Sequence, residues 1–212
     1  ARLETHLRVR RLQAEPRDKN AMLERISTTD TVTGMRTRRY VGELLAIEVL
    51  RASRYRTPLA VAMCDLDHFK RVNDGFGHPA GDVVLATTSD VIRRTLRATD
   101  TAGRYGGEEF LLVLPGIEGA GARALAERVR AAIEETEFDL GVESPYPVTL
   151  RVGVATLCDG QGVEALVTAA DEALYAAKAA GRNRVVVAGD TQRGLDSDEG
   201  KTRPGHRARR SR

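Results

Sequence analysis

Two glutamates follow a pair of glycines in Gly106-Gly107-Glu108-Glu109, and an apolar run from 110 to 114 comes next. Adjacent glycines tolerate positive φ angles, so the pair predicts a two-residue type I′ or II′ turn between two strands. A turn without side chains lets a bulky anionic ligand approach both carboxylates. Hard divalent cations such as Mg²⁺ prefer oxygen ligands and keep substrate phosphates in their coordination shell. The stretch is compatible with a metal and phosphate site, but by itself it favours a decorated hairpin without a ligand.

A second pair of acids, Asp65 and Asp67, follows the apolar run 59–64. This run begins after Pro58 and predicts a strand that is buried on both faces. Residues two apart on an extended chain project from the same face, and ligand sites of sheet proteins favour strand ends. We therefore expect the pair to contribute to a site. Solvated acids at a strand exit are the alternative.

The remaining periodicity predicts the elements that position these acids. We expect helices at about 37–54, 119–136 and 163–180. A further helix follows a Gly-rich connection at 75–82 and reaches about 97, and capping of this helix is one alternative role for Asp82. Strands are expected at about 100–105, 109–114 and 184–187, with 138–140 and 148–157 as a second strand pair. This order predicts an α+β fold with a mainly antiparallel central sheet covered by helices.

The composition fits one globular domain with flanking segments. The chain has 212 residues, of which 42% are hydrophobic and 30% charged. Residues 1–26 show a sparse helical pattern interrupted by Pro16, which is typical of a helical leader or linker. Because the chain begins at Ala1 and not at Met, we expect this leader to continue from an upstream region. Residues 189–212 are polar and nearly free of aliphatic side chains, which predicts a disordered basic tail.

The net charge and the cysteines exclude some classes of function. The charge of +3 equals the surplus of Lys and Arg in the tail, so the body is neutral, and aromatic residues are only 4%. A nucleic-acid surface needs a basic stripe and usually stacking rings, so no nucleic-acid partner is expected. Cys64 and Cys158 lack metal-ligand spacing and are interpreted as reduced core residues of a cytoplasmic protein. No apolar run is long enough for a membrane span in this segment.

Several sequence motifs follow one another in a characteristic order. They are DTVTGM (30–35), DLDHFKRVND (65–74), GHPAGD (77–82), GGEEF (106–110), ADEALYAAK (170–178) and GRNRV (181–185). Together they resemble the GGDEF-domain family, the diguanylate cyclases, over about residues 27–188. The similarity rests on the order of the motifs along the chain and not on the hairpin alone. Mild departures lie in the leading turn, at Val32, Met35 and Thr37.

The resemblance implies that two GTP molecules condense to cyclic di-GMP and two pyrophosphates. It implies two Mg²⁺ (or Mn²⁺) ions per nucleotide site, held by Asp65, Glu108 and the backbone carbonyl of Leu66. Glu109 would be either an extra metal contact or a base. The substrate-binding positions implied are Asn73 and Asp82 on the guanine edge, Lys70, Lys178 and Arg182 on the β- and γ-phosphates, and Phe69, Gly106 and Gly107.

The spacing of Arg97 and Asp100 before the hairpin is similar to the inhibitory product site of the family, with Arg128 as a secondary contact. In isolation, an Arg at a helix end followed by a turn Asp has no such meaning. Arg offers a planar fork to phosphate and to the guanine Hoogsteen edge, and Asp accepts from guanine N1-H and N2-H₂. The resemblance thus implies feedback inhibition by cyclic di-GMP.

One nucleotide pocket cannot present two GTP molecules antiparallel, so the expected active species is a homodimer. The leader agrees with this expectation, and the domain is expected in the cytoplasm, tethered to a sensor or membrane region upstream. A catalytically inactive module that senses GTP or cyclic di-GMP is an alternative function. A different nucleotide cyclase is a second one, against which Asp82 speaks because its carboxylate suits guanine.

Overall fold

The computed structural model describes residues 28–141 and 145–189, which form a six-stranded sheet with helices packed on it. The predicted leader and all of the predicted tail except Gly189 lie outside the described residues. The strands are β1 (Arg36–Thr37), β2 (Leu59–Leu66), β3 (Thr101–Arg104), β4 (Glu109–Pro115), β5 (Leu150–Thr156) and β6 (Val185–Val187). The described helices are α2 (Arg38–Tyr55), α3 (Phe69–Phe76), α4 (His78–Thr95), α5 (Gly119–Glu134) and α6 (Val163–Ala179).

Strand β2 lies inside the sheet, whose order is β1-β3-β4-β2-β5-β6. It pairs antiparallel with β4 and β5, and β3 pairs antiparallel with β4. The edge strands β1 and β6 pair in parallel with their neighbours. All of β2 is buried, as its continuous apolar run predicts. The predicted α+β fold with a mainly antiparallel sheet is confirmed.

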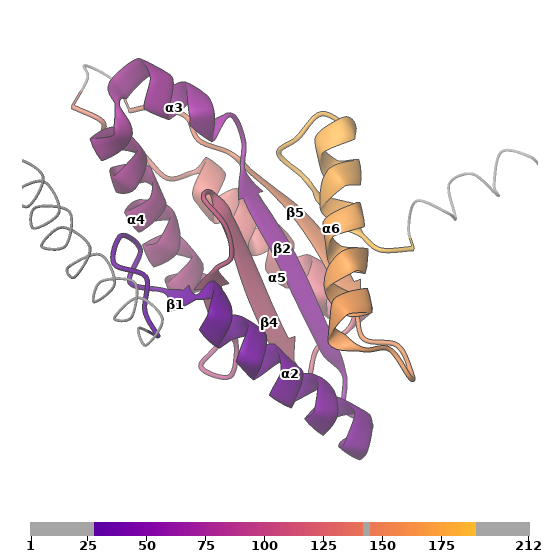
Figure 1. Ribbon diagram of the computed structural model, residues 1–212. Coiled ribbons are helices and arrows are strands. Elements are labelled where there is room, and N and C mark those ends of the chain that lie inside the picture. Colours follow the sequence, from indigo (N-terminus) through magenta and orange to yellow (C-terminus); the bar gives the residue numbers. More distant parts are fainter. Residues whose placement is uncertain (1–27, 142–144, 190–212) are drawn as a thin grey trace, which may run out of the picture.

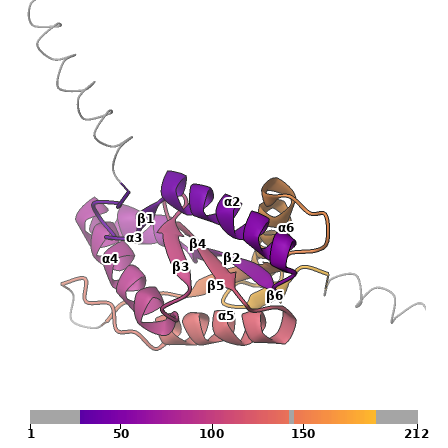
Figure 2. The same cartoon turned by 90° about the horizontal axis from the view of Figure 1, so that it is seen from below.

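The helices cover the two faces of the sheet. Figure 2 shows α2 and α6 on one face and α5 with α4 on the other. Alternate residues of β2 follow this division, because successive side chains of a strand point to opposite faces. Val61 and Met63 pack in the cluster with α2 and α6, whereas Ala62 and Cys64 pack in the cluster with α4 and α5. Asp65 continues the first series and therefore faces the side of α2 and α6.

Two sequence predictions about local structure are wrong. The Gly-rich connection is mostly helical, since α3 continues to Phe76 and α4 begins at His78, with the break at Gly77, where φ is 83°. Residues 138–140 form no sheet strand and contribute only an isolated bridge between Phe138 and Tyr146. Pro145 and Pro147 flank that bridge, and proline has no N–H with which to extend a ladder.

The cysteines differ in their surroundings. Cys64 is buried and free, and burial raises the pKa of its thiol. Cys158 is free but exposed, so its predicted place in the core is wrong. It lies beyond the end of β5, where the chain has left the sheet. None of the described helices is long and apolar enough to cross a membrane.

Candidate active site

Asp65 is the charged residue at the centre of the candidate site. The strand register places it opposite Glu109 of β4 and Arg151 of β5. Its side chain is 11% exposed, and its Oδ1 lies 2.6 Å from Nη2 of Arg151. That contact is an ion pair without hydrogen-bond alignment, because the same buried oxygen accepts no hydrogen bond. Asp65 therefore has a buried oxygen whose hydrogen-bonding capacity is unused.

The surroundings of Asp65 disfavour its charge. Burial has the largest effect and raises the pKa of the Asp65 carboxyl to about 7. The Arg151 guanidinium acts against this rise, whereas the negative charges of its acidic neighbours add to it. These neighbours are Glu108, Glu109 and Asp67. A cation at this position would offset both the unfavourable burial of the charged carboxylate and its repulsion by the neighbouring acids.

Asp67 is fixed by hydrogen bonds within the protein. Its Oδ1 accepts from Nη1 of Arg151 at 2.8 Å. Its Oδ2 accepts from Oγ1 of Thr149 at 2.8 Å and from the backbone N–H of Asn183 at 2.9 Å. The two acids do share one face, as their spacing predicts, but Asp67 joins β2 to β5 and to the turn after α6.

The hairpin loop differs from the predicted two-residue turn. Neither Gly106 nor Gly107 has a positive φ, which types I′ and II′ require. The N–H groups of Tyr105 and Gly106 both donate to the carbonyl of Glu109, at 2.7 and 3.2 Å, and form a longer loop. A Cβ on Gly106 would overlap the Glu109 carboxylate, whereas Gly107 faces open space. What Gly106 provides here is space for the Glu109 carboxylate and not a positive φ angle.

Arg104 connects this loop to the turn that precedes β1. Its Nε and Nη2 donate to the carbonyl of Gly107 at 3.1 and 2.7 Å, and its Nη1 donates to both Asp30 oxygens at 3.2 Å. Burial raises the pKa of Asp30, but hydrogen bonds from Thr33 and the Arg104 charge outweigh it and hold the pKa below its ordinary value. The carbonyl that precedes Glu108 is therefore fixed from outside the hairpin.

The acidic strand end and the hairpin also meet through the backbone. The N–H of Leu66 donates to the carbonyl of Glu108 at 3.3 Å. Figure 1 shows α3 and the C-terminal end of α6 at the same end of the sheet as the tip of β2. The structure thus brings Asp65, Leu66, Glu108 and Glu109 together.

The predicted guanine contacts lie on α3 and α4. Asn73 packs on Gly81, where a Cβ would overlap its amide oxygen. Asp82 is exposed inside α4, so it does not cap the helix, whose N-cap is Gly77. Lys70 is exposed, and Phe69 is buried in the core, which leaves its backbone for a ligand.

The predicted phosphate contacts lie at the end of α6. Lys178 is exposed in the last turn of the helix, and Arg182 follows with φ of 65°. The next residue, Asn183, is tied to Asp67 by its N–H and to Arg130 of α5, whose Nη1 donates to its Oδ1 at 2.8 Å. The sequence interpretation missed both Arg151 and Asn183, because only the strand register and the turn bring them to Asp65 and Asp67.

The acidic groups suit a hard divalent cation. Asp65 offers a buried oxygen without a hydrogen bond, and Glu108 and Glu109 add negative charge close to it. In the part of the chain that the structure describes, no three His, Cys, Asp or Glu side chains gather into a ready metal cluster. Mg²⁺ in nucleotide enzymes is usually held by one or two carboxylates together with substrate phosphates, so such a partial set fits.

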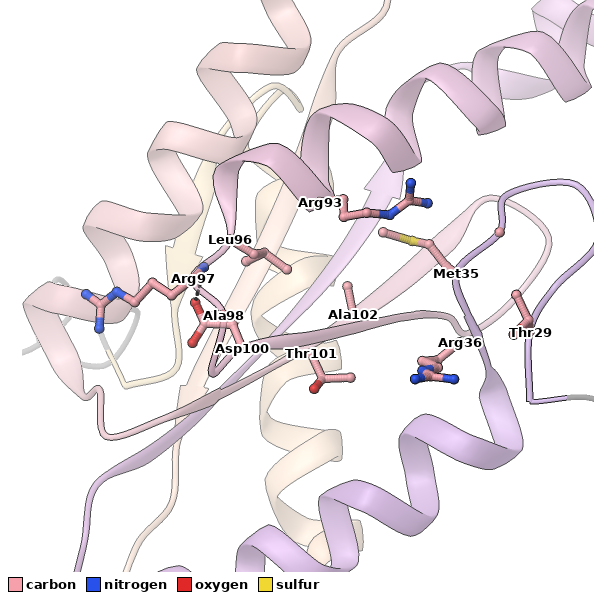
Figure 3. Close-up of a pocket in the computed structure, with 11 residues that line it drawn as sticks. Thr29, Met35, Arg36, Arg93, Leu96, Arg97, Ala98, Asp100, Thr101 and Ala102 are labelled. Carbon is pink, nitrogen blue, oxygen red and sulfur yellow. Dashed lines mark hydrogen bonds between the residues drawn. The ribbon is translucent and has the colours of Figure 1, made fainter.

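A separate pocket of about 590 Å³ is lined by both Arg97 and Asp100. Oδ2 of Asp100 accepts from the backbone N–H of Arg97 at 3.0 Å, and its buried Oδ1 has no hydrogen-bond partner. Figure 3 shows the Arg97 guanidinium directed away from those of Arg36 and Arg93, which also line the pocket. Arg128 is not in the lining, and its Nη2 reaches the carbonyl of Thr95 at 3.5 Å.

Comparisons with known proteins agree on one family. The family model described as "Diguanylate cyclase, GGDEF domain" matches residues 27–184. Diguanylate cyclase DgcP of Pseudomonas aeruginosa is 43% identical over 160 residues, 76% of this chain and 24% of DgcP. The chain thus spans about a quarter of that relative.

Solved structures are similar as well. The GGDEF domain of DgcB from Caulobacter crescentus, in complex with c-di-GMP, has a TM-score of 0.74 and 32% identity, covering 77% of this chain and 94% of that one. The active GGEEF domain of a diguanylate cyclase from Vibrio cholerae has a TM-score of 0.68 and 35% identity, covering 72% and 96%. The resemblance seen in the sequence motifs is confirmed.

The raised pKa of Asp65 predicts how stability depends on pH without metal. An unfolded Asp has a pKa of about 4, so between there and about 7 the folded state holds a proton that the unfolded state lacks. The free energy of unfolding should therefore fall as the pH rises through this window. Urea unfolding of chelator-treated protein at about pH 5 and about pH 8 measures the fall, which should be smaller in Asp65→Asn. Equal changes in parent and variant would contradict the assignment.

Proposed function

Because the chain belongs to the GGDEF-domain family of diguanylate cyclases, we propose that it condenses two GTP molecules into cyclic di-GMP and releases two pyrophosphates. The observation that carries the proposal is the buried Asp65 carboxylate, with an oxygen free of hydrogen bonds, beside the glutamates of the Gly-Gly loop. The acidic and glycine positions of the GGEEF motif are all present. Incubation with GTP, ATP and Mg²⁺ followed by chromatography tests it, and absence of product from GTP would favour a sensor.

The reaction needs positioning and neutralisation of charge more than covalent chemistry. Each 3′-hydroxyl attacks the α-phosphate of the other nucleotide, and pyrophosphate leaves. Two Mg²⁺ ions held by Asp65, Glu108 and the Leu66 carbonyl would activate the hydroxyl and neutralise the triphosphate. Glu109, whose carboxylate lies against Gly106, serves as an added metal contact or as a base. Bare backbone at Gly106 and Gly107 leaves room for the nucleotide.

The nucleotide would be held from both ends. Asn73 and Asp82 contact the guanine edge, where a carboxylate accepts from N1-H and N2-H₂ together. Exposed Lys70 and Lys178, with Arg182, bind the β- and γ-phosphates. Phe69 contributes through its backbone, since its side chain is buried.

One chain supplies one half-site, so the proposed active species is a homodimer in which two GTP molecules face each other. We place the catalytic domain at 27–188, with 1–26 as a linker from an upstream region and 189–212 as a tail. A cytoplasmic location follows from the substrate, because GTP is a cytoplasmic nucleotide.

Feedback inhibition is proposed at the pocket of Arg97 and Asp100. The unpartnered, buried Oδ1 of Asp100 is an acceptor suited to the guanine N–H groups, and Arg97 supplies a fork for phosphate. Arg128 is a secondary contact from α5. A rotation of the Arg97 side chain is needed for it to reach a ligand in the pocket, since its guanidinium points away in Figure 3.

Glu108→Gln should lower the rate of cyclic di-GMP synthesis by at least about 100-fold, since it removes a charge that the phosphoryl transfer needs. The fold should be retained, because Glu108 is in the loop and outside the core. Chromatography of products from GTP measures the rate, and circular dichroism checks the fold. Glu135→Gln at the exposed end of α5 is the matched control. Equal rates in Glu108→Gln and the control would remove the metal assignment.

Asp82→Ser should relax the choice of base. The variant loses the carboxylate that accepts two guanine donors, so kcat/KM for GTP should drop about tenfold or more and ATP should become a substrate. Competition between GTP and ATP measures the ratio. Asp90→Ser, an exposed acid of the same helix, serves as the control. Strict use of GTP by the Asp82 variant would show that another group reads the base.

Arg97→Ala should abolish product binding at the inhibitory pocket. Calorimetric titration with cyclic di-GMP compares the variant with the parent and with Arg94→Ala, an exposed neighbour on α4. We expect at least about tenfold weaker binding for Arg97→Ala alone, since a charged fork to phosphate is lost. Undiminished binding by this variant would rule the site out.

A further inference from the structure

Arg151 is a buried cation between two carboxylates. It is 7% exposed, and its two terminal nitrogens contact different acids: Nη1 lies 2.8 Å from Oδ1 of Asp67, and Nη2 lies 2.6 Å from Oδ1 of Asp65. Burial of a charge is unfavourable unless it is paired and hydrogen-bonded. If the guanidinium moved away from one of the two acids, that buried carboxylate would need a new partner.

The two contacts of Arg151 are unequal. The contact to Asp67 is an aligned hydrogen bond, and Asp67 is itself held by Thr149 and Asn183. The contact to Asp65 is an ion pair only, since Oδ1 of Asp65 accepts no hydrogen bond. Arg151 is thus anchored through Asp67, and it neutralises Asp65 without using the hydrogen-bonding capacity of that oxygen.

We propose that Arg151 is a positioning residue that holds Asp65 and offsets its charge, so that Asp65 binds a divalent cation tightly only when nucleotide phosphates add negative charge. The inference rests on the proposed function, because it assigns Asp65 to the metal. A fixed positive charge next to a metal ligand repels a second cation, and the interaction is strong where water is scarce. Loading of the metal would then be coupled to binding of GTP.

The place of Asp67 supports this coupling. The N–H of Asn183 donates to its Oδ2, and Asn183 directly follows Arg182, a proposed phosphate contact. An ion pair and hydrogen bonds therefore connect Asp65, Arg151 and Asp67 to the turn after α6, where the phosphate contact is proposed. Phosphates bound at that turn would lie near Asp65. In their absence, Arg151 reduces the net negative charge there.

The test is calorimetric or spin-resonance titration of Mn²⁺ into protein without nucleotide, at the same pH of about 8 for the parent and all variants, because metal affinity depends on pH. Arg151→Gln keeps a side-chain N–H donor, on a shorter side chain, but removes the charge, and it should tighten Mn²⁺ binding about tenfold or more. Arg151→Lys keeps the charge and should bind like the parent. Binding by Arg151→Gln that is equal to or weaker than that of the parent would overturn the inference.

Asp67→Asn provides a second, opposite test that keeps a hydrogen-bonding side chain beside Thr149 and Asn183. It leaves the full charge of Arg151 to act on Asp65, so Mn²⁺ binding should weaken. If Arg151→Gln does not fold, as its thermal unfolding will show, this variant decides: unchanged or tighter binding would contradict the inference. Synthesis of cyclic di-GMP from GTP by the parent is measured separately, so failure of the proposed function is distinguished from failure of the role of Arg151.

Discussion

The pairing of one buried guanidinium with two carboxylates is the constraint around which the candidate site is built. Asp65 and Asp67 leave the central strand on one face, and the register of β5 places Arg151 beside them. Because buried charges need partners, this triad fixes the end of β2 relative to β5. It also leaves Asp65, crowded by the glutamates of the loop, with a pKa raised to about 7 and an oxygen free of hydrogen bonds. The same arrangement that secures the sheet thus leaves an acidic oxygen that a cation could use, with the charge of Arg151 beside it.

Two further connections fix the loops that would hold a nucleotide. Arg104 spans from Asp30 to the carbonyl of Gly107 and so fixes the loop that carries Glu108. Asp67 holds the backbone of Asn183 and so fixes the turn after α6. Glu108 and Arg182 lie in these two loops, and each loop is tied to the sheet by a charged side chain. Hydrogen bonds of this kind, from residues that do not themselves contact the ligand, keep the reacting groups in place.

The sequence predicts most of the fold because apolar runs and helical periodicity report burial directly. The buried run before Asp65 and the strands around the Gly-Gly pair are where these signals place them. The sequence does not reveal contacts that depend on register: Arg151 and Asp67 are 84 positions apart, and Arg104 and Asp30 are 74 apart. The sequence also misled where glycines were interpreted from their conformational freedom. Gly106 provides space beside Glu109 without a positive φ, and Gly75 lies within a helix. The assignments of metal, guanine and phosphate contacts come from family resemblance and remain predictions.

In the proposed half-site, Asp65 and Glu108 hold the catalytic cations. Crystals grown with Mn²⁺ and 3′-deoxy-GTP, which lacks the attacking hydroxyl, test this assignment through anomalous scattering. We expect an anomalous peak in direct coordination with carboxylate oxygens of Asp65 and Glu108 and with the triphosphate, at about 2.0–2.3 Å. A nucleotide bound with its metal away from both carboxylates would overturn the assignment.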